Sequence, residues 1–348
     1  MTEKEAKELI GQLKNMDLLE RGDYLYKKDE IVSECRFGKK TEIPPLVTII
    51  IPAYRRPELF RIALKSAIEQ KNFDDYQILI TDDSDELAIQ NEKIVRELAS
   101  DKVIYYKNAK PLGWYNWNRL IELSESKWIC MLHDDDVLNC NHLYYMSQLL
   151  TKCPEAGMLA CDRTFMMSPD AGVMIAEGDI NTRTVRKHSY KEWNFRYGSF
   201  MLGAWIDRGK LIEQGGFFDG IISLDYHFVV KMAMNYGYYS SDLATYGYGI
   251  YSNESMKSDM WEKMLISEYY LCQSMIQHRA SILRPILRRL EEYSMACHIE
   301  DMSHPSMNIY GVEIDVERIC EWLGIRYEKK DSVALKTMMK IYNMIFSS

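Results

Sequence analysis

Short apolar runs alternate with amphipathic segments between residues 46 and 132, and this alternation restricts the fold more than any other feature. The first run, residues 46–51, is continuous and β-branched, which is typical of a strand buried on both faces. Strands that alternate with helices at this spacing predict βαβ units and a mainly parallel, Rossmann-like α/β sheet flanked by helices. Further strands are predicted at 76–81, 102–106 and 127–132. Helices are predicted at 58–70, between the second and third strands as far as about residue 98, and at 115–124.

The regions outside this alternation have other patterns. The first forty residues alternate leucines with charges, as in a helix, whereas 162–190 is polar and loop-like. A helix is predicted from 225 to 236, and several more after 260. We therefore predict a helical N-terminal lead-in (1–44), an α/β domain (45–255, with halves 45–140 and 141–255) and a C-terminal helical extension (256–348).

Composition excludes several classes of protein. The chain has 348 residues and a net charge of −8, which argues against nucleic acid as a general partner. The eight cysteines form no CxxC pair, so neither a zinc site nor a disulfide framework is indicated. The sequence opens on a charged segment without the pattern of a signal peptide, and no apolar run approaches the ~20 residues of a membrane span. A cytoplasmic protein is expected.

Acidic side chains follow two of the predicted strands. Asp134, Asp135 and Asp136 come after the fourth run, with His133 before them, and Asp82 and Asp83 end the second run. Clustered carboxylates suit Mg²⁺ or Mn²⁺, which leave sites open for substrate phosphates. The alternative is an acidic turn that caps the following helix. Ligands bind beyond the carboxyl ends of parallel strands, so two acidic ends favour a binding site.

Four motifs occur in an order that is specific to one family. They are Ile50-Ile51-Pro52-Ala53-Tyr54-Arg55-Arg56-Pro57, then Ile80-Thr81-Asp82-Asp83-Ser84, then Gly113 with Asn118, then Leu132-His133-Asp134-Asp135-Asp136. In this order they resemble the inverting family 2 glycosyltransferases of the GT-A fold, over about residues 46–255. The stretch 113–119 is similar to members associated with bacterial surface polysaccharides. The resemblance implies metal-dependent, inverting transfer of a sugar from a nucleotide-sugar to a hydroxyl of a glycan, lipid-linked or protein-linked acceptor.

The resemblance also implies roles for individual residues on the donor side. Asp135 is the first candidate metal ligand for Mn²⁺ or Mg²⁺, with Asp136 or Asp134 next to it. His133 stands where many members carry the first acid, and a structural or hydrogen-bonding role is expected for it. Uracil is the commonest base in the family, so a UDP-sugar is the default donor. The implied nucleotide-binding residues are Pro52, Ala53, Tyr54, Arg56, Asp82, Asp83, Gly113, Asn118 and Asp134.

The acceptor side requires a base. Asp225 matches the catalytic aspartate of the family, although Leu224 replaces the usual preceding glutamate and Asp225 also fits a helix cap. Trp205 and Asp207 are expected to border the acceptor, with a core position as the alternative for Trp205. Tyr251 stands where the family often has a histidine of the metal or diphosphate site, so ligation from that loop is not expected.

Two other classes and one partner stay open. A nucleotidyltransferase would usually carry a Gly-rich loop with a lysine after the first strand, and 52–56 has no glycine. A non-catalytic carbohydrate-binding relative would explain Leu224 and Tyr251. The arginines of 279–289 lie among leucines and isoleucines and suit either contact with the inner face of an anionic membrane or packing on a neighbouring helix or subunit. The oligomeric state is open.

Overall fold

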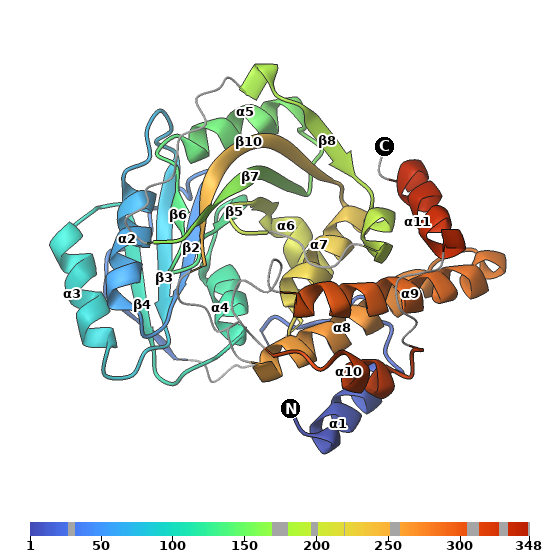
Figure 1. Ribbon diagram of the computed structural model, residues 1–348. Helices are drawn as coiled ribbons and strands as arrows, with labels where there is room; N and C mark the ends of the chain where they lie inside the picture. Colours follow the sequence, from blue (N-terminus) through green and yellow to red (C-terminus); the bar gives the residue numbers. More distant parts are fainter. Residues whose placement is uncertain are drawn as a thin grey trace.

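A ten-stranded mixed sheet lies at the centre of the described part of the chain (Figure 1). The structure is a computed structural model, and it describes residues 1–26, 32–168, 180–195, 201–218, 220–250, 258–304, 313–326 and 333–346. The strand order is β1-β4-β3-β2-β5-β9-β7-β10-β6, and β8 pairs with β10. The strands are β1 (Ser33–Phe37), β2 (Val47–Ala53), β3 (Tyr76–Asp82), β4 (Val103–Asn108), β5 (Trp128–Met131), β6 (Val137–Leu138), β7 (Met158–Met166), β8 (Val185–His188), β9 (Trp205–Asp207) and β10 (Tyr238–Gly249).

The order of the parallel strands reverses beside β2. The chain builds outward from β2 through β3 to β4, and then returns to place β5 on the other side of β2. Such a reversal opens a crevice at the carboxyl ends of the two central strands. Because β9 is antiparallel to both β5 and β7, and β10 is parallel to β7, most strands run in one direction. The predicted mainly parallel α/β sheet is confirmed.

Helices cover both faces of the sheet, because successive side chains of each strand point to opposite faces. Ile49 and Ile51 of β2 pack into one core with α2, α3 and α5, whereas Ile50 packs into a second core with α4, α7 and α8. The helices are α1 (Glu3–Leu13), α2 (Pro57–Ile68), α3 (Ala88–Leu98), α4 (Tyr115–Leu123), α5 (His142–Lys152), α6 (Arg208–Gln214), α7 (Leu224–Asn235), α8 (Ser258–Gln277), α9 (Arg284–Ser303), α10 (Val316–Leu323) and α11 (Val333–Phe346), with 3-10 turns η1 (Ile180–Thr182), η2 (Tyr190–Phe195) and η4 (Ser281–Leu283).

The two ends of the chain pack against the same side of the sheet. Figure 1 shows α8, α9, α10 and α11 on the side away from α2 and α3, with α1 beside α10. Ala6 and Leu13 of α1 share the second core with Leu265 of α8 and Ile319 of α10. Among the described residues, no helix is both long enough and apolar enough to cross a bilayer. The three predicted parts therefore share one core, and the boundaries between them stay a prediction.

Two stretches that were predicted to be helical or loop-like contain strands. The helical lead-in also contains a strand, β1, which pairs antiparallel with the edge strand β4 and is largely exposed. The polar stretch 162–190 is not all loop, since β7 continues to Met166 and β8 pairs with β10. Both errors concern strands whose polar side chains face solvent, where no apolar alternation marks a strand.

Candidate active site

The loop after β2 and the loop after β5 meet at the reversal in strand order. The backbone N–H of Tyr54 donates to Asp134 Oδ2 at 2.8 Å, which joins the two strand ends directly. The Arg56 guanidinium binds both Asp134 and Asp135. Tyr54 keeps 40% of its surface exposed, and the Arg55 guanidinium lies over its ring, 5.0 Å from the centre, so stacking on a planar ligand is open to the part of the ring that Arg55 leaves exposed. The predicted grouping of Tyr54, Arg56 and the acidic cluster is therefore present at this edge of the sheet.

The three aspartates have different partners and are all nearly buried. Asp136 accepts hydrogen bonds from the hydroxyl of Tyr246 and, at 2.8 Å, from the N–H of Gly249, both in β10. Burial, together with repulsion from Asp135, raises the pKa of both Asp134 and Asp136, and Arg56 opposes the rise at Asp134. Crowded carboxylates with raised pKa values are stabilised by a cation placed between them.

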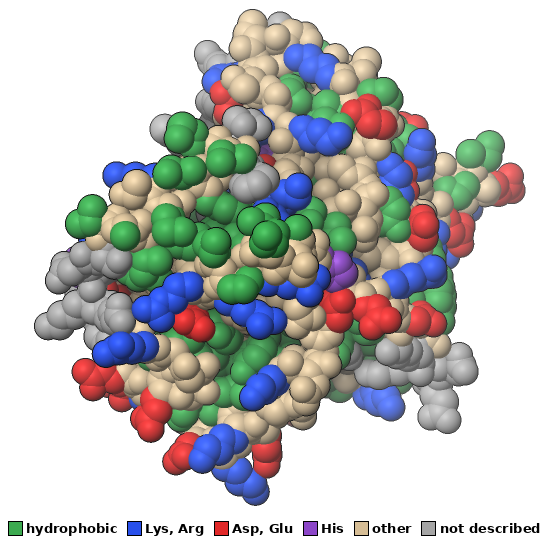
Figure 2. All heavy atoms as spheres, turned by 90° about the vertical axis from the view of Figure 1, so that its right-hand side faces the viewer, with side chains coloured by type: hydrophobic (Ala, Val, Ile, Leu, Met, Phe, Trp, Pro, Cys, Tyr) green, Lys and Arg blue, Asp and Glu red, His purple; other side chains and the backbone are tan. Residues whose placement is uncertain are grey.

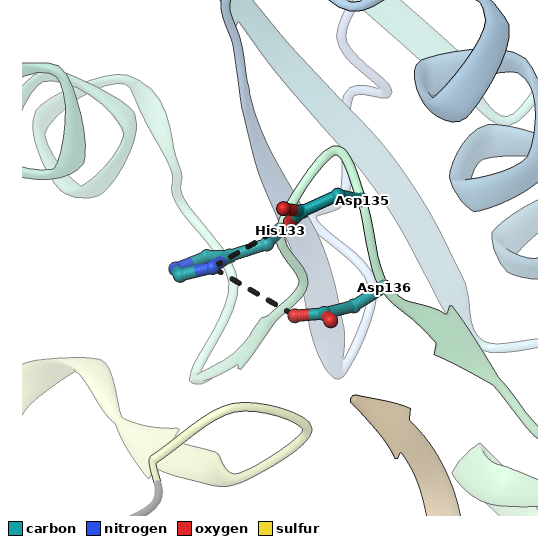
Figure 3. Close-up of side chains that lie close together, drawn as sticks. All are labelled: His133, Asp135 and Asp136. Atoms are coloured by element: carbon teal, nitrogen blue, oxygen red, sulfur yellow. Dashed lines mark ion pairs between the residues drawn. The ribbon is translucent and has the colours of Figure 1, made fainter. Parts of the chain in front are cut away.

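His133 joins this acidic cluster. Its Nδ1 lies 3.7 Å from Asp136 Oδ2 and 3.9 Å from Asp135 Oδ1, and Figure 3 draws both interactions from the same ring nitrogen. One ligand atom from each of the three residues lies within 4.8 Å of the others. Burial lowers the pKa of His133 to about 3, so the ring is neutral, the form that binds metals. One imidazole with two carboxylates fits a divalent cation such as Mn²⁺.

The acids at the carboxyl end of β3, Asp82 and Asp83, fix the loops around them. Asp82 is fully buried and accepts from the N–H of Ser84 (2.6 Å), from Asn91 (2.9 Å) and from the hydroxyl of Tyr105 (2.6 Å). This position contradicts a nucleotide contact for Asp82, because no surface of its carboxylate is accessible.

Asp83 ties the loop after β4 to the sheet. Its carboxylate accepts from Asn108 (2.7 Å) and from the N–H groups of Leu112 (2.8 Å) and Gly113 (3.0 Å). Gly113 has a φ of +58°, a backbone conformation that glycine adopts without strain. Burial raises the pKa of Asp83, and its hydrogen bonds oppose the rise. A role for Asp83 and Gly113 in nucleotide binding stays a prediction, as do those of Pro52 and Ala53, which end β2 beside them.

The buried position of Asn118 contradicts its predicted role in nucleotide binding. The side chain is fully buried in α4, and its amide donates to the carbonyl of Phe217 at 2.9 Å while accepting from the N–H of Phe217 at 2.8 Å. The adjacent Gly216 has a φ of +83° and lies so close that a Cβ there would be 2.8 Å from Asn118 Oδ1. Asn118 therefore fixes the turn before α7 from inside the protein.

We expect Asn118→Ala to destabilise the protein by about 2–4 kcal/mol, because it leaves the buried N–H and carbonyl of Phe217 without partners. The free energy of unfolding in urea measures the effect. Gln90→Ala, an exposed change on α3, is the control and should stay within about 0.5 kcal/mol of the parent protein. Equal stabilities for the two variants would contradict the conclusion that Asn118 fixes the turn before α7.

Trp205 and Asp207 do not border the acidic cluster. Trp205 is fully buried, and its ring lies 6.3 Å from that of Trp128 and 5.7 Å from that of Phe73. Asp207 pairs with Trp128 at the amino end of β5, opposite to the end that carries the cluster, and caps α6 by accepting from the N–H of Lys210. The predicted acceptor contacts are wrong: Trp205 belongs to the core and Asp207 is a helix cap.

Asp225 lies in the first turn of α7 and is half-buried. Burial, and to a smaller extent the charge of Glu268 in α8, raise the pKa of Asp225 to about 6. A carboxylate with this pKa is ionised at neutral pH and is basic enough to accept a proton from a hydroxyl group that is losing it to a reaction. Its predicted role as base stays a prediction. Tyr251 lies outside the described residues.

Sequence reasoning missed two aromatic residues at this site. The Trp117 ring lies 5.1 Å from that of His133, and the Tyr246 hydroxyl binds Asp136. Trp117 belongs to the aromatic stretch 113–119, and its place within this motif could have indicated that it lies at the site. Tyr246 is one of many tyrosines in a strand of mixed polarity, and no local pattern distinguishes it.

Comparison with known proteins identifies similar folds. The sequence profile of glycosyl transferase family 2 matches residues 48–212, and no match was found among curated proteins. The structure of S. aureus TarS 1-349 in complex with UDP-GlcNAc is similar, with 13% identity, a TM-score of 0.54, and coverage of 80% of this chain and 79% of that one. The mannosyltransferase PcManGT from Pyrobaculum calidifontis in complex with GDP-Man and Mn²⁺ has 14% identity and a TM-score of 0.52, with coverage of 99% and 94%. At these identities the likeness shows the fold, and the predicted GT-A fold is confirmed.

Proposed function

The profile of glycosyl transferase family 2 matches residues 48–212, and on that premise we propose that the chain is a metal-dependent, inverting member of this family that transfers a sugar from a nucleotide-sugar to an acceptor hydroxyl. The observation that carries the proposal is the meeting of Tyr54, Arg56 and the cluster of His133, Asp135 and Asp136 at the reversal of strand order. This is the place where a parallel sheet offers a ligand crevice.

The donor would lie across the ends of β2 and β5. The exposed part of the Tyr54 ring would offer a stacking surface to the base, and Arg56 would place a positive charge near the diphosphate. Asp134 holds both residues in place through the Tyr54 N–H and the Arg56 guanidinium. Its contribution to donor binding is therefore to orient the groups that touch the nucleotide.

His133, Asp135 and Asp136 would hold Mn²⁺ or Mg²⁺. When bound, such an ion neutralises the negative charge that develops on the departing diphosphate. The imidazole favours Mn²⁺, because Mg²⁺ prefers oxygen ligands almost exclusively. Tyr246 and Gly249 donate to Asp136 and so fix the direction in which its carboxylate faces.

The acceptor hydroxyl would be activated by Asp225. As the acceptor oxygen forms its bond to the anomeric carbon, its proton passes to the Asp225 carboxylate. The bond from that carbon to the phosphate oxygen breaks on the opposite side, and its electron pair leaves with the nucleoside diphosphate. Attack from the side opposite to the leaving group inverts the anomeric centre.

A UDP-sugar donor and an acceptor in a bacterial surface glycan, lipid-linked or protein-linked, complete the proposal. The UDP-GlcNAc complex of TarS supports uridine, whereas the GDP-Man complex of PcManGT supports guanosine and Mn²⁺. The motif stretch 113–119 supports the surface-glycan assignment. The protein is proposed to act in the cytoplasm, where nucleotide-sugars are made.

A donor panel tests the proposal. The purified protein is incubated with UDP-, GDP- and dTDP-sugars, with Mn²⁺, with Mg²⁺ and with EDTA, and the released nucleoside diphosphate is measured. We expect release from one class of donor, dependent on the added metal. Binding without release from any donor would identify a non-catalytic relative instead. Release of pyrophosphate from a nucleoside triphosphate and a sugar phosphate would identify a nucleotidyltransferase.

A further inference from the structure

Helix α11 presents apolar side chains on two sides. Leu335, Met339 and Tyr342 pack inward in a small core with Leu287 and Leu290 of α9. The second side carries Met338, Ile341 and Ile345, which are 39%, 46% and 59% exposed. Their spacing of three and four residues places them in one stripe along the helix. A stripe of this kind normally packs against another element, and the described residues provide none for it.

The turn between α8 and α9 carries a second group of exposed apolar side chains. Ile282, Leu283 and Ile286 are 82%, 43% and 49% exposed. The turn and α11 are held together, because the Arg279 guanidinium lies 5.6 Å from the centre of the Tyr342 ring. We call the surface formed by the exposed residues Ile282, Leu283 and Ile286 of the turn and Met338, Ile341 and Ile345 of α11, together with the basic side chains beside them, the basic apolar face.

Basic side chains outnumber acidic ones around these residues, although Arg279 is buried and Arg289 Nη1 lies 3.9 Å from Glu292 Oε2. Segments 279–290 and 333–346 contain six basic residues and no acidic residue, although the chain as a whole has a net charge of −8. Arg288, Lys336 and Lys340 are exposed. Figure 2, which looks onto this side of the molecule, shows a broad group of hydrophobic side chains with Lys and Arg, as well as Asp and Glu, side chains beside it. Apolar side chains bordered by basic ones fit a partner that has an anionic surface and an apolar layer below it.

We propose that the basic apolar face rests on an anionic lipid bilayer, with Ile282, Ile286, Ile341 and Ile345 inserted between headgroups and the arginines and lysines at the phosphate level. A second copy of the chain fits less well. A symmetric dimer places the same patch on both sides, and would bring basic side chains against basic side chains. The inference does not depend on the proposed sugar transfer, since it concerns a separate surface.

Vesicle sedimentation tests the proposal. The purified protein should sediment with phosphatidylcholine vesicles that contain phosphatidylglycerol, and stay in solution with pure phosphatidylcholine vesicles or at high ionic strength. Met338→Glu/Ile345→Glu should abolish binding, and both positions are exposed, so the core is not disturbed. Ile89→Glu on α3, at a residue 77% exposed, is the matched control and should bind like the parent protein.

The charge requirement is tested separately with Lys336→Gln/Lys340→Gln, which should lower partitioning on the order of ten-fold. This variant keeps every apolar side chain, so it remains informative where the double glutamate variant fails to fold. Failure of the folded parent protein to bind anionic vesicles at low salt would overturn the proposal, as would equal binding to neutral vesicles. A doubled mass in light scattering that Met338→Glu/Ile345→Glu halves would assign the face to a second copy instead.

Discussion

Asp225→Asn should lower the rate of sugar transfer by about 10²–10⁴-fold, the usual contribution of a general base, and leave donor affinity unchanged. The amide has the shape of the carboxyl group but cannot accept the proton of the acceptor hydroxyl. Asp225 lies in the first turn of α7, whereas Tyr54 and Arg56 lie on the loop after β2. Release of nucleoside diphosphate measures the rate, and equilibrium binding of the nucleotide measures the affinity.

The pH profile adds a second readout of the same residue. Because burial raises the pKa of Asp225 to about 6, kcat/KM should rise with pH up to about 6 and level off above it. Glu268→Gln removes a negative charge that contributes to this raised pKa, so the rise should move to lower pH. Normal turnover by Asp225→Asn would show that another group is the base.

Asp135→Asn should weaken Mn²⁺ binding by at least the ~10–100-fold that loss of an outer-shell partner costs. Asp135 lies in the one His/Asp group of the described residues that could hold a metal, and it is also bound to Arg56. Its replacement therefore removes a ligand and leaves the Arg56 charge less compensated. Electron paramagnetic resonance of free Mn²⁺ gives the affinity without requiring an acceptor or turnover.

Two matched variants decide which carboxylate joins Asp135. Asp136→Asn should weaken Mn²⁺ binding, because Asp136 lies with His133 and Asp135. Asp134→Asn should have the smaller effect on the metal and the larger effect on the nucleotide, because Asp134 holds Tyr54 and Arg56. The opposite ranking would show that Asp134, and not Asp136, joins Asp135 in binding the metal, and the metal site would then lie nearer to Arg56 than to His133.

The parallel half of the fold was predictable because each of its strands is buried on both faces. The apolar runs of β2 and β3 are continuous, and their bounds agree with prediction to within one or two residues. β1 and β10 were missed for the opposite reason. β1 is an exposed edge strand, and β10 mixes serine, glycine and aspartate with aromatic residues, so only pairing with distant strands specifies it.

The site was predictable where it is local in sequence. His133, Asp135 and Asp136 lie within four consecutive positions, so any turn after β5 brings them close together. The roles of Asn118 and Asp207 depend on partners supplied by other elements. Asn118 binds a carbonyl 99 residues away, and Asp207 owes its position to the antiparallel pairing of β9 with β5. Neither partner can be read from a motif.

The segment after α1 is held by groups that come much later in the chain. The carbonyl of Leu18 accepts from His227 across 209 residues, and its N–H donates to Ser274 across 256 residues. During synthesis, this segment leaves the ribosome before α7 and α8 and therefore acquires these partners only after those helices have emerged. Closing such long loops costs chain entropy before any contact repays it, which slows folding. Until then Leu18 and Leu19, both buried in the native core, are exposed to water and to other chains.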